Sequence, residues 1–180
     1  MEIIKTSIED LVIIQPKVFE DERGYFMESY KESFIKENFP NINFIQDNES
    51  KSTYGVLRGL HFQKAPFEQT KLVRVIKGEI FDVALDLRKS SSTYGKWESI
   101  VLSEDNKKQF LIPKGFAHGF LTLSKETIIH YKVDQIYNPK ADSGIQFDDE
   151  ELSIPWPIEK KQILISKKDR LLESFNSTIH

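Results

Sequence analysis

The chain contains no cysteine, and this absence excludes several kinds of chemistry. Without thiols there can be no disulfide scaffold, no thiolate zinc site and no cysteine nucleophile. A chain without disulfides also fits a reducing compartment, so we expect a cytoplasmic protein. No apolar run approaches the length of a membrane span, and Met1–Lys5 carries no basic-then-apolar leader. We therefore expect no membrane association.

An excess of one charge is also lacking, because 25 Lys and Arg residues stand against 28 Asp and Glu residues, for a net charge of −3. Surfaces that bind nucleic acid are normally strongly basic, so we expect no nucleic-acid partner. Aromatic residues, in contrast, are plentiful, with 13 Phe, 6 Tyr and 2 Trp. A chain of 180 residues is long enough for a substantial core. We expect one folded domain over residues 1–180.

Short apolar runs with alternating polarity follow one another along the chain, separated by Gly, Pro, Asn, Asp and Ser. Their close and regular spacing is typical of an all-β sandwich or barrel. Helical patterning is confined to Lys31–Phe39 and Lys168–Phe175. The expected strands are Leu11–Ile14, Tyr25–Tyr30, Phe44–Glu49, Val56–Gln63, Lys71–Ile76, Glu79–Leu87, Trp97–Leu102, Gln109–Ile112, Gly119–Leu123 and Ile128–Val133.

The dipeptide Lys77-Gly78 lies between two alternating runs, as in a hairpin with a two-residue turn. In that register Val73 pairs with Asp82, and Lys71 lies on the same face as Asp82. Charged side chains are rarely buried without a partner or a function. Lys71 and Asp82 therefore form either a plain cross-strand ion pair or part of a pocket for an anionic or polar ligand.

Histidine is scarce, with four in the chain, yet one lies in its most informative segment, Arg58-Gly59-Leu60-His61. This segment combines a group that titrates near neutral pH with a permanent cation. Metal sites in β-barrels commonly use a His-x-His pair, but the residue two places after His61 is Gln63, so we expect no metal. Strict alternation would turn Arg58 and His61 to opposite faces. A bulge or twist near Gly59 is needed if both are to reach one pocket.

Two further segments contain candidate groups for chemistry. A turn at Pro113–Gly115 leads into His118, and Tyr131 follows His130 in an apolar strand. Taken singly, such residues are usually part of the packing. Because motifs for acyl transfer, nucleotide hydrolysis and hydride transfer are missing, metal-free proton chemistry is what remains. The last histidine, His180, is terminal and expected to be disordered.

A series of motifs runs through the chain from about Pro16 to Asp169. They are Asp21–Glu28, Gln46–Asn48, Val56–Gln63, Lys71–Val75, Gly78–Val83, Ile112–Phe120, Tyr131-Lys132, Ile154–Pro157 and Ser166–Asp169. In this order they resemble the dTDP-4-dehydrorhamnose 3,5-epimerase family. The resemblance implies a cupin-like jelly roll with a few short peripheral helices, without metal or cofactor. It also implies that the protein is a homodimer and that its substrate is a dTDP-sugar.

The resemblance implies conversion of dTDP-4-dehydro-6-deoxy-D-glucose to dTDP-4-dehydro-L-rhamnose, on the route to dTDP-L-rhamnose and polysaccharides. The C4 ketone acidifies the hydrogens on C3 and C5, and each inversion needs a base, an acid and stabilisation of the enolate. By resemblance His61 is the base and Tyr131 the acid. Asp169 is the carboxylate that orients His61, and Lys71 stabilises the enolate oxygen.

The resemblance also assigns substrate contacts. Arg58 and Arg23 suit diphosphate oxygens, because each guanidinium offers a planar fork of donors. In the family, Arg23 and Glu28 tend to act on the neighbouring subunit's site. The other expected substrate-binding residues are Gln46, Asn48, Asp82, His118, Asp142 and Lys168. For Gln46 and Asn48 a purely structural role at the end of a strand stays open.

Some positions depart from the family pattern: Asp142 stands where Glu is frequent, and His130 stands where an apolar residue is common. Three alternatives to the 3,5-epimerase stay open at this point. The nearest is a 3-epimerase or 5-epimerase of a related dTDP-4-keto-6-deoxysugar pathway. A metal-dependent cupin oxygenase or isomerase lacks its ligand set. A non-catalytic sugar-nucleotide-binding module would not need His61, Lys71 and Tyr131 together.

Overall fold

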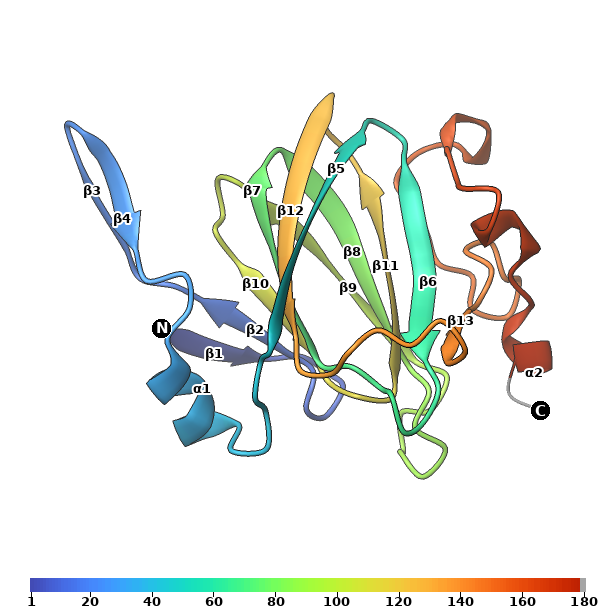
Figure 1. Ribbon diagram of the computed structural model, residues 1–180. Helices are drawn as coiled ribbons and strands as arrows, with labels where there is room; N and C mark the ends of the chain where they lie inside the picture. Colours follow the sequence, from blue (N-terminus) through green and yellow to red (C-terminus); the bar gives the residue numbers. More distant parts are fainter. Residues whose placement is uncertain (179–180) are drawn as a thin grey trace.

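Two facing antiparallel sheets form the body of the molecule, seen in the computed structural model, which describes residues 1–178 (Figure 1). His180, whose disorder the sequence predicts, lies outside the described residues. The six-stranded sheet contains, in order, β1 (Glu2–Lys5), β2 (Val12–Gln15), β10 (Gln109–Ile112), β7 (Lys71–Lys77), β12 (Glu126–Val133) and β5 (Gln46–Thr53). The five-stranded sheet contains β13 (Asp142–Gly144), β6 (Leu57–Gln63), β11 (Phe116–Thr122), β8 (Glu79–Asp86) and β9 (Trp97–Ser103).

Apolar side chains that alternate along the strands fill the space between the two sheets. Val73 and Val75 of β7 share one buried cluster with Ile80 and Ala84 of β8, and Phe110 of β10 is completely buried among them. Burial of apolar surface at about 25 cal/mol per Å² is the main force that holds such a sandwich together. The predicted all-β jelly roll is confirmed.

A two-stranded hairpin projects from this body (Figure 1). It is made of β3 (Val18–Asp21) and β4 (Gly24–Met27). The helical elements are short and peripheral, namely α1 (Glu32–Asn38), η1 (Lys160–Gln162), η2 (Asp169–Leu171) and α2 (Phe175–Thr178). Within residues 1–178 no helix is long and apolar enough to cross a membrane.

The predicted hairpin around Lys77-Gly78 is wrong. β7 pairs with β10 and β12, whereas β8 pairs with β9 and β11, so the turn passes the chain from one sheet to the other. Val73 faces Phe110 and Tyr131 in its own sheet, not Asp82. Alternation determines which side chains point inward but does not say which strand lies alongside. The two side chains form no direct ion pair, and Asp82 affects Lys71 only as a charge that opposes the effect of burial on the pKa of Lys71.

The predicted helix over Lys168–Phe175 is also wrong. The segment forms the single turn η2 and then an extended stretch before α2. The segment is fixed by contacts with other parts of the chain, such as the bond between Asp169 and His61, and these do not require a helix. The short strands β1, β3 and β13 were not predicted from the sequence, whereas α1 agrees with the predicted helix over Lys31–Phe39.

Candidate active site

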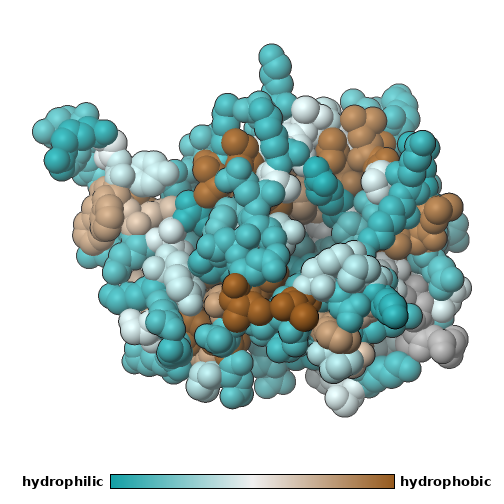
Figure 2. Space-filling view, in the orientation of Figure 1, coloured by the Kyte–Doolittle hydropathy of each residue, from teal (hydrophilic) through white to brown (hydrophobic). Residues whose placement is uncertain are grey.

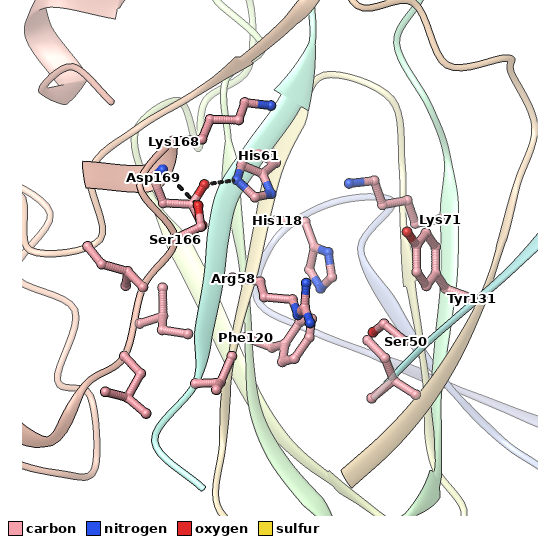
Figure 3. Close-up of a pocket in the computed structure, with 15 residues that line it drawn as sticks. Ser50, Arg58, His61, Lys71, His118, Phe120, Tyr131, Ser166, Lys168 and Asp169 are labelled. Carbon is pink, nitrogen blue, oxygen red and sulfur yellow. Dashed lines mark hydrogen bonds and ion pairs between the residues drawn. The ribbon is translucent and has the colours of Figure 1, made fainter. Parts of the chain in front are cut away.

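An open cavity of about 490 Å³ lies between the two sheets and holds most of the predicted site residues. A second hollow of about 460 Å³ adjoins it. Because His61, Lys71, Tyr131 and Lys168 line both spaces, the two are parts of one site. Figure 3 shows His61, His118 and Arg58 on one wall, with Lys71 and Tyr131 on the opposite wall.

His61 of β6 is bonded to a buried carboxylate. Its Nε2 lies 2.7 Å from Asp169 Oδ1, and the Asp169 side chain is only 5% exposed. A charged carboxylate accepts the Nε2 proton, which leaves Nδ1 with a free lone pair in the neutral ring. Figure 3 shows Nδ1 turned towards the open space of the cavity. His61 is therefore arranged to accept a proton from a molecule in the cavity.

The carboxylate of Asp169 stays charged although it is buried. Burial by itself raises the pKa of Asp169, but hydrogen bonds from His61, Ser166 and the Gly59 backbone outweigh it and lower the pKa below its usual value. The Asp169 backbone N–H donates to Ser166 Oγ at 3.0 Å, which fixes the turn that carries the carboxylate. A fixed anion beside the ring favours the imidazolium that forms after proton abstraction.

A bulge in β6 lets Arg58 and His61 reach the same cavity, as the sequence required. His61 pairs with His118 of β11, and Arg58 pairs with Phe120, so two residues of β6 face a single residue of β11. Gly59 adopts φ +122°, and a Cβ there would lie 2.6 Å from Gly119 Cα. Glycine is the residue that fits this close approach.

Lys71 of β7 and Tyr131 of β12 are partly buried on the wall that faces His61. Burial lowers the pKa of Lys71 to about 8, while the charges of Asp82 and Asp142 act in the opposite direction. Burial raises the pKa of Tyr131, and the Arg58 cation opposes that rise. Near neutral pH the cavity therefore holds a cationic ammonium and a protonated phenol opposite the imidazole.

His118 of β11 lines the cavity and is supported from behind by Asp82. Its Nε2 lies 2.7 Å from Asp82 Oδ1. Asp82 of β8 is completely buried and lines neither part of the cavity. The prediction that Asp82 itself contacts the substrate does not fit this position, because the His118 ring lies in front of it.

Three predicted binding residues surround the cavity mouth. Arg58 donates from Nε to Ser52 Oγ at 3.1 Å, which holds the guanidinium beside the cavity. Lys168 and Asp142 form an ion pair at the edge of the second hollow. The Tyr137 hydroxyl donates to Asp142 Oδ2 at 2.8 Å. This mouth is therefore strongly polar, as a site for a charged ligand requires.

Gln46 and Asn48 lie near the start of β5 and line the second hollow. Gln46 Nε2 donates to Asn48 Oδ1 at 2.8 Å, so the two amides support each other. Arg23 and Glu28, in contrast, line neither part of the cavity. Arg23 lies on the projecting hairpin, paired with Asp21. Within one chain, these two residues are not brought to the site.

The sequence reading missed several residues of the cavity. Ser50 lines it from β5 and lies two residues after Asn48, so strand alternation could have indicated its side. Phe120 and Ser166 line it as well. Neither carries a signal of its own, because Phe120 resembles any core residue and Ser166 acts through a turn.

Gln63 stands where a His-x-His metal site would have its second histidine. Its side chain is buried and hydrogen-bonded to backbone groups of neighbouring loops. Its Nε2 donates to Phe67 O at 2.7 Å and Ile136 O at 3.1 Å, and its Oε1 accepts the Asn138 N–H at 2.6 Å. Across residues 1–178, no three His, Cys, Asp or Glu side chains gather in a way that could hold a metal ion.

Fold and cavity together define a class of protein, a cupin-type barrel with a carboxylate-bound histidine and a buried tyrosine on facing walls of one cavity. A family model described as dTDP-4-dehydrorhamnose 3,5-epimerase matches residues 5–177. The dTDP-4-dehydrorhamnose 3,5-epimerase of Methanothermobacter thermautotrophicus is 56% identical over 168 residues, covering 93% of this chain and 90% of that protein. The chain belongs to the dTDP-4-dehydrorhamnose 3,5-epimerase family.

Solved structures agree with this assignment. A dTDP-6-deoxy-D-glucose-3,5-epimerase from Legionella pneumophila, in complex with dTDP-4-keto-L-rhamnose, superposes with a TM-score of 0.93 at 45% identity, covering 97% of this chain and 93% of that one. A 3'-monoepimerase from Streptomyces bikiniensis, in complex with dTDP-quinovose, has a TM-score of 0.88 at 27% identity, covering 96% of this chain and 87% of that one. The fold is thus shared by enzymes that are named for two different outcomes.

Proposed function

We propose that this chain is the 3,5-epimerase that converts dTDP-4-dehydro-6-deoxy-D-glucose to dTDP-4-dehydro-L-rhamnose on the route to dTDP-L-rhamnose. The observation that carries the proposal is the placement of His61 and Tyr131 on facing walls of one cavity, with Lys71 beside Tyr131. The 56% identity to a named 3,5-epimerase supports it. The chain works as a single jelly-roll domain over residues 1–180, in keeping with a family match that spans residues 5–177.

Proton abstraction begins at His61. A 4-ketosugar in the cavity presents the acidic hydrogens on C3 and C5, and Nδ1 of His61 accepts one of them. The Asp169 carboxylate, 2.7 Å from Nε2, stabilises the imidazolium that results. Because Asp169 is held by several hydrogen bonds, it does not need to reorganise as the charge develops.

Loss of the proton turns the ketone into an enolate with negative charge on the C4 oxygen. The Lys71 ammonium stabilises this oxygen, and a cation acts strongly in a partly desolvated cavity. Tyr131, on the wall opposite His61, then delivers a proton to the other face of the carbon. Removal from one face and return to the other inverts the centre, and no cofactor is needed.

The diphosphate is held by the cations at the mouth. Arg58 is held in place by its bonds to Ser52 Oγ and the Lys51 carbonyl and brings a guanidinium to the cavity, and Lys168 adds a second positive charge at the rim. His118 lines the same wall as Arg58, where its ring can hydrogen-bond to the substrate. Gln46, Asn48 and Asp142, at the second hollow, contact the remaining polar groups of the substrate.

Incubation with dTDP-4-dehydro-6-deoxy-D-glucose in heavy water tests the function directly. Deuterium at both C3 and C5, with the rhamno product, is the expected result. Label at one carbon identifies a mono-epimerase, the second candidate, whose fold is shared by the Streptomyces bikiniensis enzyme. An absence of exchange at both carbons rules out both epimerase activities.

The variant His61→Asn tests the base. Asparagine keeps the approximate size but has no basic lone pair, so exchange at both carbons should fall by about 10³-fold or more. The matched control is His130→Asn, a histidine on the outer side of the sheet that lines neither part of the cavity. The control should exchange at the wild-type rate, and exchange by His61→Asn at that rate would remove His61 from its role.

The hairpin β3–β4 supports a homodimer. It projects from the body and carries exposed aromatic side chains, with Phe19 52% and Phe26 67% exposed (Figure 1). Figure 2 shows a hydrophilic tip and apolar atoms nearer the body. Exposed apolar groups on an arm are typical of a surface that another chain covers. In the dimer Arg23 and Glu28 reach the partner's cavity.

A cytoplasmic location, expected from the sequence, completes the proposal and is tested by fractionation.

A further inference from the structure

Asp82 is a buried carboxylate that the proton-transfer steps do not use. It lies on β8 with no exposed surface, and its Oδ1 accepts the Nε2 proton of His118 at 2.7 Å. Its second oxygen, Oδ2, is buried and has no hydrogen-bond partner among the described residues. Leaving an oxygen of a buried carboxylate without a hydrogen bond destabilises the fold, and such a loss is usually offset by function or by a cation that acts on the carboxylate.

The cation on which the Asp82 charge acts is Lys71, which lines the cavity from the other sheet without forming an ion pair with Asp82. Asp82 is the leading charge that opposes the effect of burial on Lys71, ahead of Asp142. Asp142 is already engaged, because Lys168 and the Tyr137 hydroxyl both bond to its carboxylate. Asp82 is therefore better placed than Asp142 to keep a positive charge on Lys71.

We propose that Asp82 is a positioning residue for the epimerisation. Across the barrel it keeps the Lys71 ammonium charged. Through Oδ1 it accepts the Nε2 proton of His118 and so fixes which nitrogen of that ring is the donor. This inference rests on the proposed function of the same cavity. Asp82 does not touch the substrate. It acts by holding a fixed negative charge behind the two groups that do.

The other charged and titratable groups around Lys71 do not replace Asp82. They are His61 and Arg58 from β6, Tyr131 from β12, His118 from β11, Asp142 from β13, Lys168 just before η2, and Asp169 at the start of η2. Of the carboxylates among them, Asp169 is bonded to His61 and Asp142 to Lys168. Tyr131 cannot supply a negative charge near pH 8, because burial raises its pKa above the usual value of 10.

The pH profile separates this role from simple packing. With the pKa of Lys71 at about 8, activity that needs its charge declines as the pH rises through 8. Asp82→Asn keeps the shape and an oxygen for His118 but removes the charge. The alkaline limb of kcat/KM should then move down by about one pH unit, so activity at pH 8.5 falls about tenfold while activity at pH 6.5 stays within about threefold.

A matched control is Asp86→Asn on the same strand. Asp86 is equally buried but lies at the end of β8 and lines neither part of the cavity. Its variant should lower stability and leave the alkaline limb where the wild type has it. A folded Asp82→Asn enzyme whose alkaline limb stays at about pH 8, or whose activity falls equally at both pH values, overturns the proposal.

If Asp82→Asn does not fold, the wild-type enzyme decides. With the lysine and aspartate side chains labelled for NMR, the Asp82 carboxyl signal should shift together with the Lys71 titration near pH 8, and its failure to shift overturns the proposal. Wild-type exchange in heavy water is measured alongside. Lack of exchange by the wild type counts against the function, whereas normal exchange with an unmoved limb counts against the role of Asp82 alone.

Discussion

At the scale of single residues, the direction of each proposed proton transfer depends on which atom faces the cavity. His61 presents Nδ1 because Asp169 occupies Nε2. Tyr131 presents its hydroxyl from the opposite sheet, with a pKa that burial raises. In the proposed mechanism the Nδ1 lone pair of His61 accepts a proton and the phenol of Tyr131 gives one.

Replacement of Tyr131 by Phe should separate the two halves of the reaction. The variant lacks the proposed acid but keeps the proposed base, so loss of the substrate hydrogen should continue while the inverted product forms at least about 100-fold more slowly. Product stereochemistry and deuterium content, followed together by NMR, measure the two steps. The control Tyr54→Phe changes an exposed tyrosine away from the cavity and should behave as wild type. Inversion by Tyr131→Phe at the wild-type rate would contradict the acid assignment.

At the scale of elements, the bulge in β6 determines whether the site exists. A regular strand would turn Arg58 out of the cavity that His61 enters. Near Gly59, two residues of β6 face one residue of β11. The side chains of Arg58 and His61 therefore line the same space. The sequence indicated the need for this irregularity, because alternation failed to bring a predicted pair together.

The variant Gly59→Ala should be strongly destabilised, by about 3 kcal/mol or more, because strain at positive φ adds to a clash. Its Cβ would lie 2.6 Å from Gly119 Cα and 2.7 Å from His118 O. Gly24 has a similar φ of +124° with nothing within 4 Å of its Cβ position, so Gly24→Ala should cost only about 1 kcal/mol. Urea unfolding of both variants provides the comparison, and equal losses would show that the close approach does not matter.

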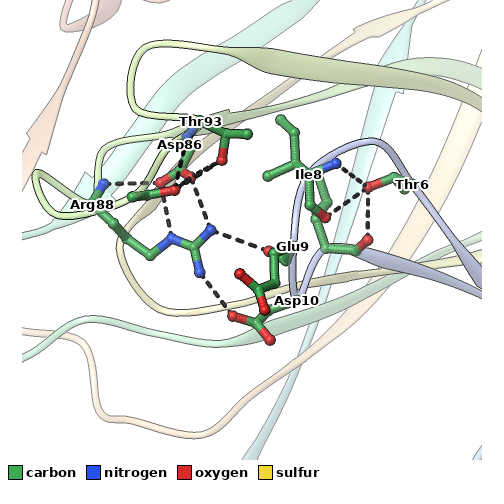
Figure 4. A network of polar contacts seen from close by, with 9 residues as sticks. Thr6, Ile8, Glu9, Asp10, Asp86, Arg88 and Thr93 are labelled. Atoms are coloured by element: carbon green, nitrogen blue, oxygen red, sulfur yellow. Dashed lines mark hydrogen bonds and ion pairs between the residues drawn. The ribbon is translucent and has the colours of Figure 1, made fainter.

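A second buried carboxylate, Asp86, helps to join the end of β8 to the loop between β1 and β2 (Figure 4). Asp86 accepts bonds from Arg88, Ser91 and Thr93, and the Arg88 guanidinium also reaches Asp10 at 2.9 Å. Burial on its own raises the pKa of Asp86, but these donors outweigh it and lower the pKa to about 2. The network ties together segments that the sheets do not pair.

Loss of the charge in Asp86→Asn should cost about 3 kcal/mol of unfolding free energy at neutral pH, because donors arranged around an anion lose their partner. The folded pKa lies below the ordinary value of 3.8, so this contribution is present above about pH 4 and disappears as the pH falls towards 2. Urea unfolding at pH 7 and pH 2.5 should show a smaller difference at the lower pH. Asp21→Asn, which removes one partner of an exposed ion pair, should leave the stability nearly unchanged at either pH.

At the scale of the whole molecule, the proposed dimer predicts complementation between inactive subunits. His61→Asn removes the base from its own cavity, and Arg23→Ala removes the arm contact from the partner's cavity. After subunit exchange in an equal mixture, about a quarter of the wild-type activity should return, since half the dimers are mixed and each has one complete site. Activity that does not rise after exchange would show that Arg23 serves no partner cavity.

The arrangement of the sheets was only partly predictable. Strand positions such as Gln109–Ile112 and the inward faces of β7 and β8 followed from alternation. The partner of each strand did not, and the predicted pairing of Val73 with Asp82 fails because β7 and β8 belong to opposite sheets. A two-residue turn is compatible with a hairpin and with a crossing between layers, and packing of the whole core selects between them.

By itself, the sequence determined the all-β class, the inward side of most strands, and the motifs that mark His61, Lys71, Tyr131 and Asp169. The class and the inward sides follow from local patterns, because alternation does not depend on distant partners, whereas the four residues were marked by the resemblance of their motifs to a known family. The tertiary structure alone decided that Asp169 lies 2.7 Å from His61 across 108 positions of sequence. It also decided that Asp82 stands behind His118, since long-range contacts and burial arise only when both sheets close around one core.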